Sequence, residues 1–96
     1  DVQSILFLIG VNELGMGYKE FSKQEKTDVL HVAICTLLEP YGYYKFEKHD
    51  NEGWPHFNLV QELPPLNDRE QQHLIKEAMI YYFIENDYFK EENASN

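Results

Sequence analysis

Four side chains that could carry chemistry share one stripe of a predicted helix, at separations of three, four and four residues: Asp28, His31, Cys35 and Glu39. A histidine and a cysteine one helical turn apart can ligate the same metal ion, and a carboxylate can complete or orient the set. Alternatively, His31 could lower the pKa of Cys35 and create a reactive thiolate. The sequence offers no second ligand pair of the Cys-x-x-Cys kind. We therefore favour a buried structural cysteine and expect neither a metal ion nor a cofactor.

Two further histidines, His49 and His56, flank a predicted turn that also carries Asp50 and Glu52. On opposite strands of a hairpin they could approach one another and form a metal site or a pH-sensitive site. Polar residues also gather near turns because turns are solvated. We favour this second interpretation for both histidines.

The sequence carries no motif of the common enzyme classes. The glycine-rich stretch at 10–17 lacks the Lys-Ser/Thr pair that a phosphate-binding loop needs, and the residues before it have a helical pattern. Zinc-protease, nucleophile-elbow, EF-hand and dinucleotide-binding fingerprints do not occur either. We therefore predict that the protein is not an enzyme.

The charge balance indicates the class of partner. Eight Lys and Arg residues stand against seventeen Asp and Glu residues, which gives a formal net charge of −9, and Arg69 is the single arginine. Nucleic-acid binders derive much of their affinity from Lys and Arg contacts to phosphates, so this charge argues against nucleic acid and against anionic membranes. An acidic surface favours a partner with a basic surface.

Three segments have the periodicity of helices. Residues 2–14 are apolar around nearly the whole circumference, which predicts a helix buried on all sides, either within this domain or against another chain. The second helix begins at a capping box formed by Ser22 and Glu25 and ends near Leu38, before a proline. The third begins at an Asn-Asp cap, and its apolar pattern spans about 67–87.

A β-hairpin separates the second helix from the third. Residues 43–49 and 57–63 alternate apolar and polar side chains, and the turn Asp-Asn-Glu-Gly at 50–53 joins them. This order predicts a helix-dominated α+β fold, α-α-β-β-α. Residues 1–90 are expected to form a single compact domain and residues 91–96 a flexible acidic tail.

Cysteine content and hydropathy predict a location. One cysteine excludes an internal disulfide and fits a reducing compartment. The apolar run at 5–9 has no basic region before it, as a signal peptide would, and it is too short to span a membrane. We expect a cytoplasmic protein that is not associated with membranes.

Aromatic side chains are concentrated around the hairpin, with six rings between residues 41 and 57. Aromatics that stack on bases normally lie in a positively charged groove, which this stretch lacks. The alternation assigns four apolar hairpin residues to the core: Tyr44, Phe46, Phe57 and Leu59. Tyr41, Tyr43 and Trp54 remain, and they form either the rim of the core or a partner-binding surface.

The favoured function is a non-catalytic interaction domain. We expect Tyr41, Tyr43 and Trp54 to bind another protein, one with a basic surface, or the chain to form a homodimer through residues 2–14 and the aromatic hairpin.

Two other classes of function stay open. Helices followed by a hairpin are typical of a winged-helix-like transcriptional regulator, although the predicted reading helix has no arginine and the hairpin turn is acidic. The second alternative is a metal- or thiol-dependent protein that uses Asp28, His31 and Cys35.

Overall fold

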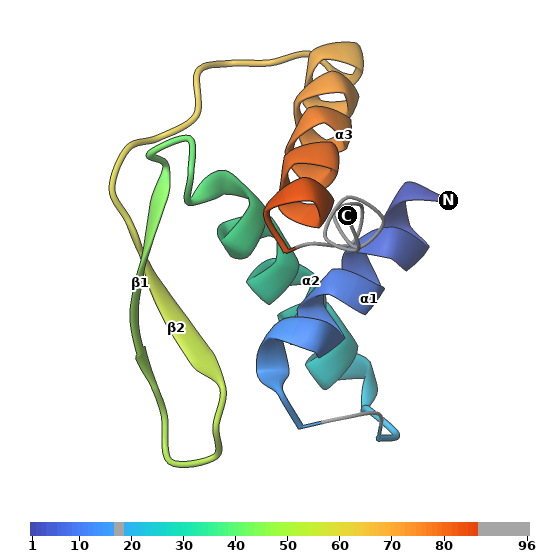
Figure 1. The fold of residues 1–96 in the computed structure, drawn as a ribbon, viewed down its shortest axis with the longest axis vertical. Coiled ribbons are helices and arrows are strands. Elements are labelled where there is room, and N and C mark those ends of the chain that lie inside the picture. Colours follow the sequence, from blue (N-terminus) through green and yellow to red (C-terminus); the bar gives the residue numbers. More distant parts are fainter. Residues whose placement is uncertain (17–18, 87–96) are drawn as a thin grey trace, which may run out of the picture. The chain divides into compact units, whose positions relative to one another are not determined.

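The computed structural model describes residues 1–16 and 19–86 and confirms the predicted α+β fold. Three helices and one antiparallel hairpin follow in the predicted order: α1 (Val2–Leu14), α2 (Lys23–Leu38), β1 (Tyr44–His49), β2 (Pro55–Leu59) and α3 (Asp68–Glu85) (Figure 1). In the described part of the chain, every helix is too short or too polar to cross a membrane.

The contacts within the chain divide it into two units, Asp1–Leu63 and Pro64–Asn96, each of which is treated by itself below. The first unit holds α1, α2 and the hairpin, and the second holds α3. A single domain over 1–90 stays a prediction, and the expected tail at 91–96 lies outside the described residues.

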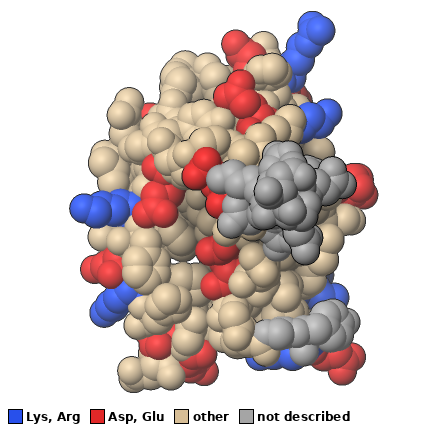
Figure 2. All heavy atoms as spheres, in the orientation of Figure 1, with Lys and Arg blue, Asp and Glu red and all other residues tan. Residues whose placement is uncertain are grey.

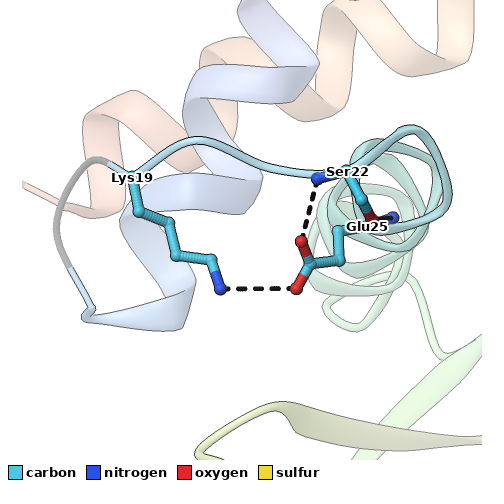
Figure 3. Close-up of polar contacts among 3 residues, drawn as sticks. All are labelled: Lys19, Ser22 and Glu25. Carbon is cyan, nitrogen blue, oxygen red and sulfur yellow. Dashed lines mark hydrogen bonds and ion pairs between the residues drawn. The ribbon is translucent and has the colours of Figure 1, made fainter.

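Local hydrogen bonds explain where the first two helices begin. At α1, the Asp1 carboxylate accepts a hydrogen bond from the backbone N–H of Ser4 at 2.8 Å. At α2, the predicted capping box is confirmed: Glu25 N–H donates to Ser22 Oγ at 3.1 Å, and Ser22 N–H donates to Glu25 Oε1 at 2.9 Å (Figure 3). Both ends thereby satisfy backbone donors that the helices leave unpaired.

The two helices of the first unit approach one another most closely at Gly10. This residue is buried on α1, and a Cβ atom built there would lie 2.6 Å from Val29 Cγ1 on α2 and nearer still to the carbonyl oxygen of Val29. Real Cβ atoms do not come this close to other atoms, so only glycine fits. The missing side chain of Gly10 therefore lets the α1 backbone lie directly against α2.

A small core joins α1, α2 and the hairpin around these positions. It consists of four buried residues, Leu14, Phe21, Val29 and Val32. Four half-buried side chains pack against them: Phe7, Val11, Trp54 and Phe57. Phe21, just before α2, meets Phe7 of α1 and Trp54 of the hairpin edge to face, with ring centroids 5.8 and 6.4 Å apart.

Among the described residues, α1 is not buried on every side within the chain, and burial against another chain stays a prediction. Leu8 leaves 66 % of its surface exposed. In the first unit, α2 supplies the main partner of α1, and one helix can cover only one side of another.

The hairpin contains an irregularity that the alternation did not predict. Tyr44 pairs with Leu59 and Phe46 with Phe57, but the next pair is Lys48 with His56, so Glu47 is an extra residue, a β-bulge. At the outer edge of β1, the Phe46 N–H donates to Glu39 Oε2 at the end of α2, at 2.7 Å.

Two of the four hairpin residues assigned to the core are exposed. Phe46 leaves 39 % and Leu59 54 % of its surface open, whereas Tyr44 and Phe57 are half-buried. The Tyr44 ring meets His31 of α2 edge to face at 6.3 Å, and Phe57 packs on the core cluster. A single helix crossing a two-stranded sheet covers part of its face, which leaves Phe46 and Leu59 outside the contact.

The second unit begins with another confirmed cap. Glu70 N–H donates to Asn67 Oδ1 at 2.8 Å, and Asn67 N–H donates to Glu70 Oε1 at 3.0 Å, which completes a capping box at the start of α3. Asp68 and Glu70 also place negative charge in the first turn, where the helix dipole favours it.

The close contact at Gly10 predicts an unusual effect of substitution. We expect Gly10→Ala to lower the free energy of unfolding by about 1–3 kcal/mol or more, as overpacking does in cores, because the new methyl group clashes with the α2 backbone at Val29. Urea unfolding followed by fluorescence and circular dichroism measures this. Ser4→Ala, at an exposed position of α1, is the control and should leave stability unchanged or slightly higher.

In open space, the same Gly→Ala change stabilises a helix by roughly 1 kcal/mol. A gain in stability for Gly10→Ala would therefore contradict the close approach of α1 and α2.

Candidate functional site: a cleft between α2 and the edge of β2

The first unit contains a cleft of about 600 Å³ between the first half of α2 and the hairpin. This volume lies within the roughly 300–1,000 Å³ that is usual for ligand-binding clefts. One bank is helical, the other is the hairpin turn with β2, and Met16 and Lys19 line the end near the α1–α2 connection.

The helical bank consists of Glu25, Asp28, His31 and Val32, which repeat at the spacing of one helix face. Glu25 is held by the capping box and by Lys19, whose Nζ lies 3.3 Å from Glu25 Oε2 (Figure 3). The pKa of Glu25 is lowered, mainly by the hydrogen bond from the Ser22 backbone and next by Lys19. Asp28 accepts a hydrogen bond from the neutral amide of Gln24 at 3.1 Å.

The hairpin bank is organised by one carboxylate, that of Asp50. Its Oδ1 accepts hydrogen bonds from the backbone N–H groups of Glu52 at 2.9 Å and Trp54 at 3.0 Å, and its Oδ2 lies 2.8 Å from His56 Nε2. The hydrogen bond with His56 is the largest cause that lowers the pKa of Asp50, followed by the bond from the Trp54 backbone. Gly53, at φ 91°, closes the turn. Asp50 thereby fixes the backbone at Trp54.

The cleft runs along the outer edge of β2. The four consecutive residues 54–57 all line it, whereas no residue of β1 does. Successive side chains of a strand point to opposite faces of the sheet. Three successive residues of β2 line the cleft, which fits a cleft along the strand's edge, and the edge that is not paired with β1 is the open one.

The lining combines apolar walls with negative charge. Trp54 and Phe57 supply aromatic surface, and the charged groups are four carboxylates and one lysine. Two of the carboxylates have charged or chargeable partners, since Glu25 meets Lys19 and Asp50 meets His56. A positively charged group with an apolar stem matches this lining.

The three sequence-predicted partner residues are not brought together. Trp54 lines the cleft and is half-buried against Phe21. Tyr41 and Tyr43, also half-buried, lie at the opposite end of the hairpin, where the Tyr43 carbonyl accepts a hydrogen bond from Val60 N–H at 2.8 Å. The six residues of β1 separate Tyr43 from the turn, and at about 3.3 Å each they amount to roughly 20 Å. Trp54 alone joins the cleft.

The fold divides the predicted helical stripe of Asp28, His31, Cys35 and Glu39. His31 lines the cleft, but Cys35 is fully buried, with its Sγ 3.4 Å from His31 Nε2. Burial raises the pKa of the Cys35 thiol from its usual 9.0 to about 11, which is the opposite of what a reactive thiolate needs. The Glu39 carboxylate accepts a hydrogen bond from the Phe46 N–H at the edge of β1.

Two metal sites were considered from the sequence, one at His31 and Cys35 and one at His49 and His56. Among the described residues, no group of three or more His, Cys, Asp or Glu side chains is placed to hold a metal ion. His49 pairs with Pro55 and its ring contacts Phe46 at 5.1 Å, whereas His56 is bonded to Asp50.

Sequence reasoning missed the cleft as a unit. The turn itself carried a signal, because Asp followed by Gly three residues later is typical of a side-chain-stabilised turn. The sequence did not predict that Asp28 and this turn line the same cleft, because their placement depends on contacts between residues far apart in the sequence.

The Asp50 turn predicts a dependence of stability on acid. Because the folded-state pKa of Asp50 lies below its usual 3.8, the ionised carboxylate stabilises the folded state above about pH 4, and this stabilisation is lost as the pH falls through the lowered pKa. Asp50→Asn keeps an acceptor oxygen for the turn but no charge beside His56. We expect the parent to be more stable than Asp50→Asn near pH 6, and the difference in unfolding free energy to shrink below about pH 4.

Glu52→Gln is the matched control, because it removes a carboxylate from the same turn and leaves the hydrogen bonds to the Asp50 side chain in place. It should change stability less than Asp50→Asn does. A difference between parent and Asp50→Asn that does not change with acid would show that the charge of Asp50 does not stabilise the turn.

The buried thiol predicts slow alkylation. A pKa of about 11 instead of 9.0 reduces the thiolate fraction near pH 8 about a hundredfold, and burial also blocks the reagent. We expect iodoacetamide to label Cys35 in the folded protein at least a hundredfold more slowly than in urea, as measured by intact mass. Rapid labelling of the folded protein would favour the thiol-dependent alternative.

Comparison with known proteins gives no family for this chain. No protein-family model matches it, and no curated protein or solved structure matches it significantly. A function must therefore be inferred from the chain's own residues, and the cleft between α2 and β2 is the feature that offers one.

Proposed function

We propose that this chain is a non-catalytic protein-interaction domain that binds a basic segment of a partner protein in the cleft between α2 and β2. One observation carries the proposal: the cleft joins the half-buried indole of Trp54 to four carboxylates. Lysine and arginine suit such a lining, because their methylene stems pack on apolar surface while the charged head meets carboxylates or aromatic faces.

The anchor of this interaction is rigid. Trp54 is held from the core side by Phe21 and through its backbone by Asp50. A large aromatic side chain that is already fixed loses little conformational entropy on binding, and tryptophan is enriched among the residues that dominate interface energies.

Charge supports the same class of partner. The formal net charge of −9 attracts a basic partner over a distance. Asp and Glu side chains are exposed in many places on the surface that Figure 2 shows. Long-range attraction thus brings a basic segment to the surface, and the cleft with Trp54 selects where it binds.

Self-association is the second form of this proposal. It is favoured by Leu8, which stays 66 % exposed on a helix that the sequence makes apolar nearly all round. A homodimer through α1 is compatible with partner binding in the cleft, because Leu8 does not line it.

The other two alternatives have less support. A winged-helix-like regulator would bring the hairpin turn to phosphates, but Asp50 and Glu52 make this turn negative. A thiol-dependent protein needs a thiolate, which the raised pKa of Cys35 disfavours. A free thiol fits a reducing compartment, and we propose a cytoplasmic location on that ground.

The binding of a basic peptide tests the proposal. Trp54 is the only tryptophan, so its fluorescence reports on the cleft. We expect a blocked hexapeptide of alternating lysine and threonine to change this fluorescence saturably, and the peptide with glutamate in place of lysine to have no effect. Binding should weaken as salt increases, since exposed charges are screened.

Variants of the chain locate the binding. Asp28→Asn should weaken the lysine peptide about two- to fivefold, as the loss of one exposed ion pair does. Asp28→Lys should weaken it further, whereas Glu47→Lys makes the same change of charge on β1, outside the cleft, and should have a smaller effect. Equal effects of Asp28→Lys and Glu47→Lys would mean that net charge alone attracts the peptide. Light scattering on the same samples reports whether the chain is a dimer.

A further inference from the structure

We infer that the partner segment binds as an extended strand that pairs with the free edge of β2. This inference rests on the proposed function, because the same cleft and the same basic segment are involved, and it specifies how the segment lies. Addition of a strand to an exposed sheet edge is a recurrent mode of peptide recognition, in which backbone hydrogen bonds supply affinity and alternate side chains supply specificity.

The hydrogen bonds of the hairpin identify which backbone groups face the cleft. Val60 N–H donates to the Tyr43 carbonyl at 2.8 Å, so Tyr43 and Val60 form a hydrogen-bonded pair. Bonded and non-bonded pairs alternate along an antiparallel ladder. The pair of Phe46 with Phe57 is therefore non-bonded, and the Phe46 N–H indeed points away from β2, to Glu39.

The same alternation directs two residues of β2 outward. Phe57, and by the same step Leu59, turn their N–H and C=O groups away from β1 and toward the side on which the cleft opens. Pro55, which begins β2, has no N–H to offer, and proline is typical of an edge strand. Phe57 and Leu59 thus present two donors and two acceptors at the spacing of an extended peptide.

The two edges of the hairpin differ in this respect. The β1 edge already donates a hydrogen bond to the α2 carboxylate of Glu39. The β2 edge borders a cleft, and the helical bank of that cleft carries Glu25 and Asp28. A third strand would therefore lie between β2 and α2, with its backbone on one bank and carboxylates on the other.

This position sets the sequence pattern of the partner. A residue of the added strand opposite Phe57 points to the same face of the sheet as Phe57, which packs on the core cluster that includes Val29 and Val32 of α2, and the acidic helical bank of the cleft belongs to the same helix. The residues before and after it point to the other face, beside His56. The segment should therefore carry lysine or arginine at every second position, and β-formers such as threonine between them.

Backbone methylation of the probe tests the pairing. Three peptides are compared by Trp54 fluorescence: the blocked lysine–threonine hexapeptide, a form N-methylated at its three lysines and a form N-methylated at its three threonines. Charge and side chains are identical in all three. Only one set of N–H groups faces β2, the lysine set in an antiparallel arrangement and the threonine set in a parallel one. We expect one methylated form to lose at least about tenfold in affinity and the other to stay within about threefold of the parent.

The outcomes separate this inference from the proposed function. If both methylated forms bind as well as the parent, the cleft binds the basic segment without strand pairing, and the inference fails while the proposed function stands. If both lose affinity equally, pairing along one edge is likewise excluded. If the unmodified peptide does not bind, the inference and the proposed function fail together.

A variant of the chain gives an independent measurement. Leu59→Pro removes one outward N–H without touching the hydrogen bonds between β1 and β2, and Leu59→Thr removes the same exposed side chain but keeps the N–H. We expect Leu59→Pro to weaken the lysine–threonine peptide about three- to tenfold and Leu59→Thr to weaken it less than twofold. Equal affinities would contradict the pairing.

If Leu59→Pro does not fold, amide hydrogen exchange of the parent chain, with and without the peptide, tests the same pairing. The amides of Phe57 and Leu59 should exchange more slowly once the peptide is bound. Unchanged exchange at both amides, with the peptide at saturation, would overturn the inference.

Discussion

The contact between Gly10 and the α2 backbone at Val29 is the constraint on which the first unit depends. α1 is short and apolar around most of its surface, so its pattern of apolar residues does not determine which side packs against α2. Gly10 determines that side, because only at this position does α1 lack a side chain that would hold α2 away. Once α1 is fixed there, Val29 is fully buried and the opposite side of α2 is left to meet the hairpin. The cleft follows from this division of α2 into two faces.

Aromatic contacts of Phe21 connect α1 and α2 to the hairpin turn. Phe21, at the entry to α2, contacts Phe7 on one side and Trp54 on the other. The Trp54 backbone is in turn held by the Asp50 carboxylate, so an aromatic contact and a polar turn fix the same residue from two directions. Trp54 is therefore both the rim of the core and a wall of the cleft.

Elements with local signals were predicted from the sequence, and features that depend on distant contacts were not. Capping boxes at Ser22 and Asn67 involve side chains three residues apart, and the sequence alone identified the first of them and the region of the second. The bulge at Glu47 leaves no such signature, yet it decides which residue lies beside Phe46. Strict alternation would place Lys48 there, and the extra residue brings His49 instead. The exposure of Leu59 likewise reflects how far α2 reaches across the sheet, which alternation cannot report. For the candidate site, the sequence identified Trp54 and the acidic turn but not that Asp28 faces them.

The two edges of the hairpin present a general problem of small sheets, because an unpaired edge can pair with any other strand, including one from a second copy. Glu39 occupies one donor of the β1 edge by accepting a hydrogen bond from the Phe46 N–H. The β2 edge is left open, but the cleft beside it is lined by Asp28, Asp50 and Glu52, so two copies approaching edge to edge would bring these carboxylates together. Like charges at close range oppose such pairing, whereas the same carboxylates attract a basic strand. In the proposed complex, one arrangement of charge would thus both protect the edge against self-association and select its partner.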